Sequence, residues 1–240
     1  MGLSLLLGIS AAAQANNPQQ LQQLLISRRC PSCDLQGVVL YQASLPRADL
    51  AQADLSESDL RQASLVNANL AGANLHRADL REASLSEADL SGANLSKGRL
   101  DAAGLIQSNL NEANLSETNL NRARLNQGRL FGVSLVNATL AEASLVSANL
   151  SRSNCSGANF QGADLFRVNA IKANFSGADL SGADMRDIRL FDANLTGANL
   201  TDANLIGANI QEADFSEAIF CRTQMPDGQV ENSGCSEESV

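Results

Sequence analysis

The stretch "SGANLSKGRL DAAGLIQSNL", residues 91–110, places a leucine at every fifth position. An α-helix repeats about every 3.6 residues and a β-strand every second residue, so neither element explains this spacing. The register runs without insertion or deletion from Leu35 to Phe220, which makes thirty-eight consecutive units with leucine at thirty of their centres. The other eight centres are Cys155, Phe160, Ala170, Phe175, Met185, Ile210, Phe215 and Phe220. An internal repeat therefore decides the fold.

Each unit has the pattern of a short extended segment followed by a corner. The residue two positions before the centre is almost always small and the residue between them is polar, as in Ala48, Asp49 and Leu50. This alternation is typical of a strand that buries one face. Ten of the seventeen glycines lie two residues after a centre, where a turn with positive φ favours glycine. Such a chain buries its inward residues by winding into a solenoid of stacked coils.

Two stretches carry the repeat in its clearest form, "ADLAQADLSE" at residues 48–57 and "ANLTGANLTD" at residues 193–202. With this A(D/N)LXX pattern, about three quarters of the chain resembles the pentapeptide repeat proteins. The resemblance implies an all-β fold, a right-handed quadrilateral β-helix with four pentapeptides in each coil. Thirty-eight units then predict about nine and a half coils, in a rod about 45 Å long.

The first residues have the pattern of a signal peptide. Residues 1–15 contain an apolar run followed by an A-x-A motif that ends at Ala15, so we expect the mature chain to begin at Asn16. The run lacks basic residues before it, which leaves a hydrophobic N-terminal extension as the alternative. It is too short to span a membrane as an anchor.

The segments on either side of the repeat are expected to cover the ends of the rod. Within residues 16–32, Asn17 and Pro18 precede leucines at helical spacing, which predicts a short N-terminal α-helical cap. The β-helix is assigned to residues 33–220. Residues 221–240 contain proline and glycine and predict a C-terminal loop cap. Both ends need covers, because an open β-edge pairs with other chains.

The five cysteines divide by their position in the rod. Cys155 occupies a centre and is expected to be a small buried side chain. Cys30 and Cys33 lie at one end, and Cys221 and Cys235 lie at the other. A disulfide needs Cα atoms within about 7 Å, so the implied rod allows only the bonds within each end. Disulfides at both caps fit an oxidising compartment.

No motif for catalysis or for a metal is found in the chain. The C-P-S-C stretch at residues 30–33 could indicate zinc, but the one histidine, His76, and the lack of a second CxxC leave zinc without ligands. A redox role would need a βαβ context that the repeat does not provide. Phosphate loops, nucleophile elbows and HExxH motifs do not occur. We therefore predict no enzyme activity, no metal and no cofactor.

The surface pattern indicates a protein partner. A net charge of −9 argues against direct nucleic-acid binding, and aromatic residues do not interleave with basic ones. Apolar residues that follow a centre gather on the two corners that flank one side, whose outward row carries two arginines. We expect them to form an exposed aromatic strip, which together with the two arginines has a composition typical of interfaces. The predicted partner-binding residues are Arg129, Phe131, Val146, Phe166, Ile171, Arg189, Phe191 and Ile206. The partner is another protein or a second copy, and the alternative is ordinary scattered surface apolar residues.

Two functions remain open. The stretches "RRCPSCDL" at residues 28–35 and "CRTQMPDG" at residues 221–228 resemble caps of exported cyanobacterial members, which implies a non-catalytic structural or interaction scaffold in the periplasm or thylakoid lumen. The alternative is the cytoplasmic DNA-mimic subgroup, which binds DNA gyrase and confers quinolone resistance. A mimic needs a phosphate-like row of carboxylates, whereas the outward aspartates here scatter over all four sides. These aspartates include Asp54, Asp59, Asp79, Asp89, Asp164 and Asp184. The scaffold is therefore favoured.

Overall fold

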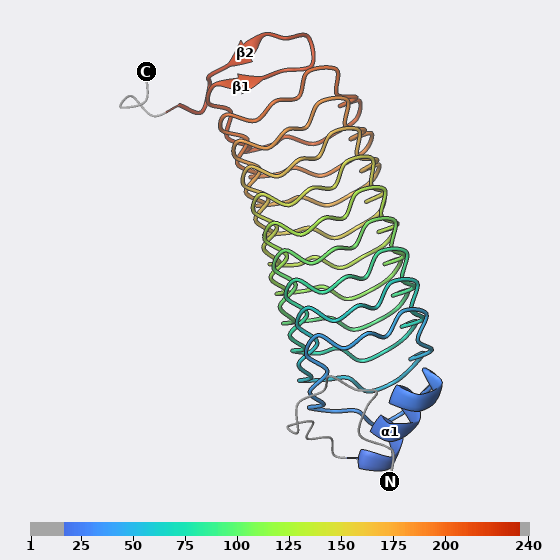
Figure 1. Ribbon diagram of the computed structural model, residues 1–240. Helices are drawn as coiled ribbons and strands as arrows, with labels where there is room; N and C mark the ends of the chain where they lie inside the picture. Colours follow the sequence, from blue (N-terminus) through green and yellow to red (C-terminus); the bar gives the residue numbers. More distant parts are fainter. Residues whose placement is uncertain (1–16, 236–240) are drawn as a thin grey trace.

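The computed structural model describes residues 17–235, so the predicted signal peptide and its cleavage site lie outside the described residues. Figure 1 shows an elongated rod of stacked coils. Helix α1, Pro18–Ser27, lies at the N-terminal end. Strands β1, Thr223–Gln224, and β2, Val230–Glu231, form an antiparallel hairpin at the C-terminal end.

A parallel ladder joins residues twenty positions apart along the whole rod, from Arg29 to Gln224. One coil therefore contains four pentapeptides and has four sides, as the resemblance implied. Two amides of each unit donate to the next coil: the Leu50 N–H reaches the Asn69 carbonyl at 2.8 Å, and the Gln52 N–H donates in the same way. Because every coil repeats these bonds, side chains twenty residues apart stack in columns.

The corners have positive φ whether or not glycine is present. From Ser32 to Arg222, the residue two positions after each centre has positive φ, and only ten of these residues are glycine. In a typical corner, Gln52 has a φ of 58°, and the Ala53 N–H donates to the Leu50 carbonyl at 3.1 Å. A left-handed conformation costs a non-glycine residue about 1 kcal/mol. Glycine thus eases the corner without being required for it.

The outward Asp or Asn of a unit supports the corner that follows it. In the unit centred on Leu55, the Ser56 N–H donates to the Asp54 side chain at 2.9 Å, which satisfies an amide that the ladder leaves free. Arginine replaces Asp or Asn before Leu130, and there Asn111 of the previous coil accepts the Phe131 N–H at 3.0 Å. The recurrence of Asp or Asn at this position of the repeat is therefore explained by the hydrogen bond that its side chain accepts from the backbone.

The core is a continuous row of inward side chains. The central residues from Leu35 to Leu205 are at most 2% exposed. Ala170 is smaller than the other centres, and the adjoining Val168 is also completely buried and compensates for the lost volume. Burial raises the pKa of the Cys155 thiol to about 12, so this cysteine stays protonated inside the rod.

The N-terminal end is covered as the sequence predicts, but the repeat starts earlier than residue 33. The Asn17 side chain accepts the Gln20 N–H at 3.2 Å and caps α1, whose buried leucines pack on the first coil. The ladder begins at Arg29, because Cys30 fills a central position, and Cys33 fills the small position of the next unit, which is centred on Leu35. These two cysteines form a disulfide, with Cα atoms 5.3 Å apart.

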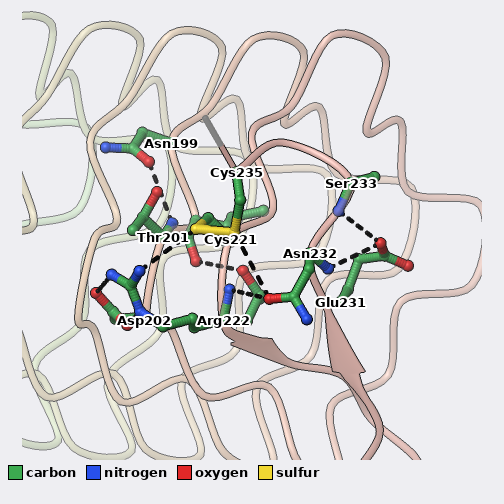
Figure 2. The surroundings of a disulfide bond; sticks show 11 residues. Asn199, Thr201, Asp202, Cys221, Arg222, Glu231, Asn232, Ser233 and Cys235 are labelled. Carbon is green, nitrogen blue, oxygen red and sulfur yellow. Dashed lines mark hydrogen bonds and ion pairs between the residues drawn. A yellow bond between two sulfur atoms is a disulfide. The ribbon is translucent and has the colours of Figure 1, made fainter. Parts of the chain in front are cut away.

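The C-terminal end also extends beyond the predicted boundary at residue 220. The ladder continues to Gln224, and residues predicted to form only a loop contain the β1–β2 hairpin. Figure 2 shows how this hairpin is held: Cys221 and Cys235 form the second predicted disulfide, with Cα atoms 4.7 Å apart. The Arg222 guanidinium donates to both carboxylate oxygens of Asp202, at 2.6 and 2.7 Å.

Candidate interaction surface

The candidate surface is one side of the rod in its C-terminal half, with the two corners that flank it. Its central row consists of Leu130, Leu150, Ala170 and Leu190. All six basic residues between positions 125 and 221 lie on this side or its corners, together with three phenylalanines. These nine residues, which we call the Phe–Arg side, are Arg129, Phe131, Arg152, Phe166, Arg167, Lys172, Arg186, Arg189 and Phe191.

The structure corrects the predicted exposure of the aromatic strip. Of the eight predicted partner-binding residues, only Arg129, Arg189 and Ile206 are exposed. The other five are half-buried, namely Phe131, Val146, Phe166, Ile171 and Phe191. Neighbouring coils lie only about 4.8 Å apart, so corner side chains cover one another along the rod. The side therefore presents partly covered phenylalanine rings and guanidinium groups to solvent.

Arginines stack on the phenylalanine rings of this side. The guanidinium carbons of Arg167 and Arg186 lie 4.7 and 5.4 Å from the Phe166 ring centroid, and that of Arg152 lies 5.8 Å from the Phe131 centroid. Such contacts contribute about 0.5 to 1 kcal/mol each at exposed sites and restrict the arginine rotamers. The sequence prediction missed these arginines and Lys172, although their register in the twenty-residue coil places all four on the same two corners.

Half of the basic groups on this side lack a carboxylate partner. The ion pairs are those of Arg167 with Asp187 at 3.6 Å, Lys172 with Asp192 at 3.3 Å, and Arg186 with Asp184 at 2.5 Å. Hydrogen bonds from the Arg186 side chain lower the pKa of Asp184. Within residues 17–235, Arg129, Arg152 and Arg189 have no carboxylate within 4 Å. Three unpaired guanidinium groups therefore point outward on a chain with net charge −9.

The outward aspartates that a DNA mimic would use have a structural role instead. All six accept a hydrogen bond from the backbone N–H two residues later, at 2.9 to 3.3 Å. They are Asp54, Asp59, Asp79, Asp89, Asp164 and Asp184. They lie on all four sides of the rod and form no continuous row of carboxylates in the described part of the chain.

Residues 17–235 contain neither a cluster of metal-binding side chains nor a helix that could span a membrane. No group of three or more His, Cys, Asp or Glu side chains in the described chain is arranged to hold a metal ion. Of the helices described, none is long and apolar enough to cross a bilayer.

Comparison with known proteins decides the family. The pentapeptide repeats family matches the chain in eight copies, over residues 33–70, 58–97, 99–135, 129–165, 148–187 and 188–225. The chain belongs to the pentapeptide repeat family. Its fold class is therefore the right-handed quadrilateral β-helix that the resemblance implied. No curated protein matches this pentapeptide repeat protein.

Several solved structures are similar to this pentapeptide repeat protein. HetL, a protein involved in heterocyst differentiation regulation from the cyanobacterium Nostoc sp. strain PCC 7120, is 34% identical, with 91% of this chain and 100% of HetL covered and a TM-score of 0.50. A thylakoid-lumen member from Arabidopsis thaliana is 25% identical over 39% of this chain and 66% of its own, with a TM-score of 0.29. QnrB1, a plasmid-mediated fluoroquinolone resistance protein, is 20% identical over 65% and 74%, also with a TM-score of 0.29.

Proposed function

We propose that this pentapeptide repeat protein is a non-catalytic scaffold that binds a partner protein through the Phe–Arg side. The observation that carries the proposal is the concentration of three unpaired arginines beside half-buried phenylalanines, on one side of an otherwise acidic rod. Arginine and aromatic residues are enriched at interfaces, and a local positive patch selects a negatively charged partner. The partner is expected to present carboxylates around a small apolar centre.

A charge reversal tests this surface. The variant with Arg129→Glu, Arg152→Glu and Arg189→Glu removes the unpaired positive charges without touching a core residue. Its matched control reverses Arg47, Arg122 and Arg124, which also lack ion pairs and lie elsewhere on the rod. Quantitative affinity capture from the source cells should lose a defined set of proteins about tenfold with the first variant only. Equal recovery with both variants would rule out the Phe–Arg side as the docking surface.

We further propose that the scaffold works outside the cytosol, in the periplasm or the thylakoid lumen. The support is the signal-like start of the chain together with cysteine pairs at both ends. The test is an intact mass of the protein purified from its source cells after alkylation under denaturing conditions. A chain that begins at Asn16 with only Cys155 alkylated agrees with export. A chain that keeps Met1 and has five free thiols indicates the cytoplasm.

Binding to DNA gyrase remains the alternative function, with less support. The aspartates it would use are engaged with corner amides and are scattered over the four sides. A supercoiling assay with purified gyrase separates the two functions. Inhibition at stoichiometric concentrations would replace the scaffold proposal, whereas unaltered supercoiling agrees with it.

A further inference from the structure

Among the described residues, 17–235, part of the ladder edge of the last coil has no hydrogen-bond partners. In the coil below, the Leu190 N–H donates to the Asn209 carbonyl and the Leu195 N–H to the Asp214 carbonyl, both at 2.7 Å. The equivalent amides one coil later have no acceptor within residues 17–235. They are the N–H groups of Ile210, Glu212, Phe215 and Glu217, on two consecutive sides of the rod. These free N–H groups can form hydrogen bonds with one more extended segment.

Apolar side chains beside this edge are also incompletely covered. Ile210, Phe215 and Phe220 are half-buried, although the centres of all preceding coils are at most 2% exposed. The two phenylalanine rings contact each other, with centroids 5.7 Å apart. A hollow of about 430 Å³ lies between Ile210 and the hairpin loop that contains Pro226 and Val230. The end of the core thus has room for additional apolar side chains.

Acidic residues surround these partly exposed apolar side chains. They are Glu212, Asp214, Glu217, Asp227 and Glu231. The only basic residue between positions 210 and 235 is Arg222, and its guanidinium group is bound to Asp202. The edge therefore carries a negative rim that favours a positively charged ligand.

We infer that this C-terminal edge binds an extended segment of a partner protein in which apolar residues are flanked by lysine or arginine. The unpaired amides would donate to carbonyls of the added strand. Apolar side chains of that strand would pack on Ile210, Phe215 and Phe220, and its lysine or arginine side chains would pair with the surrounding carboxylates. A second copy is disfavoured, because two identical acidic rims would face each other. The site shares no residue with the nine that define the Phe–Arg side, although Ile210 and Glu212 continue the same side of the rod one coil after Leu190 and Asp192.

A synthetic peptide tests the site on the full mature chain. The probe contains two Ala-Asn-Leu units flanked by lysines, and the comparison peptide carries glutamates in place of the lysines. Hydrogen exchange followed by NMR should show that the lysine peptide slows exchange of the Ile210, Glu212, Phe215 and Glu217 amides by about tenfold or more at saturation. Fluorescence anisotropy gives the affinity, which should fall with added salt.

Variants separate this site from general attraction to an acidic protein. Glu212→Lys with Glu217→Lys should weaken peptide binding about tenfold. The control, Glu112→Lys with Glu142→Lys, makes the same change at exposed corners with the same positive φ and should keep the affinity within about twofold. Equal losses in both variants, equal binding of the glutamate peptide, or no slowing of the four amides would overturn the inference. A dimer in sedimentation that Phe215→Ser dissociates would instead identify a second copy as the occupant.

Discussion

At its N-terminal end the rod buries two leucines of α1 against the first coil, whereas at its C-terminal end a disulfide and an ion pair hold a hairpin beside a half-open core (Figures 1 and 2). The first centres, Leu35, Leu40 and Leu45, are at most 2% exposed, but Phe215 and Phe220 are half-buried. Covering the core and fixing the end of the chain are therefore separate functions of a cap in a solenoid. The N-terminal cap covers the core and fixes the chain, whereas the C-terminal cap chiefly fixes the chain.

The largest loss of stability is expected from a substitution in the core midway between the two ends. Leu115→Asp places a charge in the closed core, which should cost about 4 kcal/mol or more and unfold the whole rod. Circular dichroism during heating measures the result, with Leu115→Met as the control of similar volume. Two separate melting transitions would mean that each end holds its own half of the coils, and near-wild-type melting would contradict the closed core.

The next prediction compares the covers of the two ends. Leu24→Ala removes a completely buried side chain of α1 and should lower the free energy of unfolding by about 2 to 4 kcal/mol. Phe215→Ala should cost less, about 1 to 2 kcal/mol, because part of this larger side chain is already in contact with water. Urea denaturation monitored by circular dichroism provides both values. A larger loss for Phe215→Ala would show that the C-terminal core is covered in solution.

The two disulfides should also differ in their contribution. The bond between Cys221 and Cys235 spans 14 residues and should stabilise the chain by about 3 kcal/mol, against about 2 kcal/mol for the bond between Cys30 and Cys33, which spans 3. Replacing each pair with alanine and measuring urea denaturation tests the order. A reversed order would indicate that the N-terminal bond stabilises packing under α1 in addition to closing a turn.

The smallest effect is a pH response confined to one end. Hydrogen bonds from the Arg222 side chain lower the pKa of Asp202, and backbone N–H groups of Ser233 and Asn232 lower that of Glu231. Carboxyl pKa values that are lower in the folded state stabilise it above the unfolded values near 4, and this stabilisation is lost as the pH falls below about 4.

Amide exchange in the hairpin should therefore rise between about pH 5 and pH 3, after correction for the intrinsic exchange rate. The segment Pro18–Ser27 contains no charged side chain, so corrected exchange in α1 should stay constant over the same range. Asp202→Asn should remove most of the change in the hairpin. A parallel response at both ends would point to global acid unfolding in place of a local one.

Much of this molecule follows from its sequence because the repeat fixes the register. The inward row, the corners, the N-terminal helix and the grouping of the cysteines all depend on counting by five or twenty. The ends were harder to place, since Cys30 and Met225 occupy central positions without being leucine. The exposure of Phe131 and Phe166 was overestimated, because coverage by an arginine of a neighbouring coil depends on rotamers, which spacing does not specify.

The twenty-residue coil makes position along the chain equivalent to an angle around the rod. One additional pentapeptide inserted after Phe160 would preserve the core and the ladder, yet it would turn everything beyond it by a quarter of a revolution. Phe166 would then move from one corner of the Phe–Arg side to the other, into the column of Phe131, and Arg189 would move to the next side of the rod. Four inserted pentapeptides would restore the alignment and lengthen the rod by one coil, about 4.8 Å. Insertions in this family thus act as rotations, and only whole coils leave a surface that extends over several coils intact.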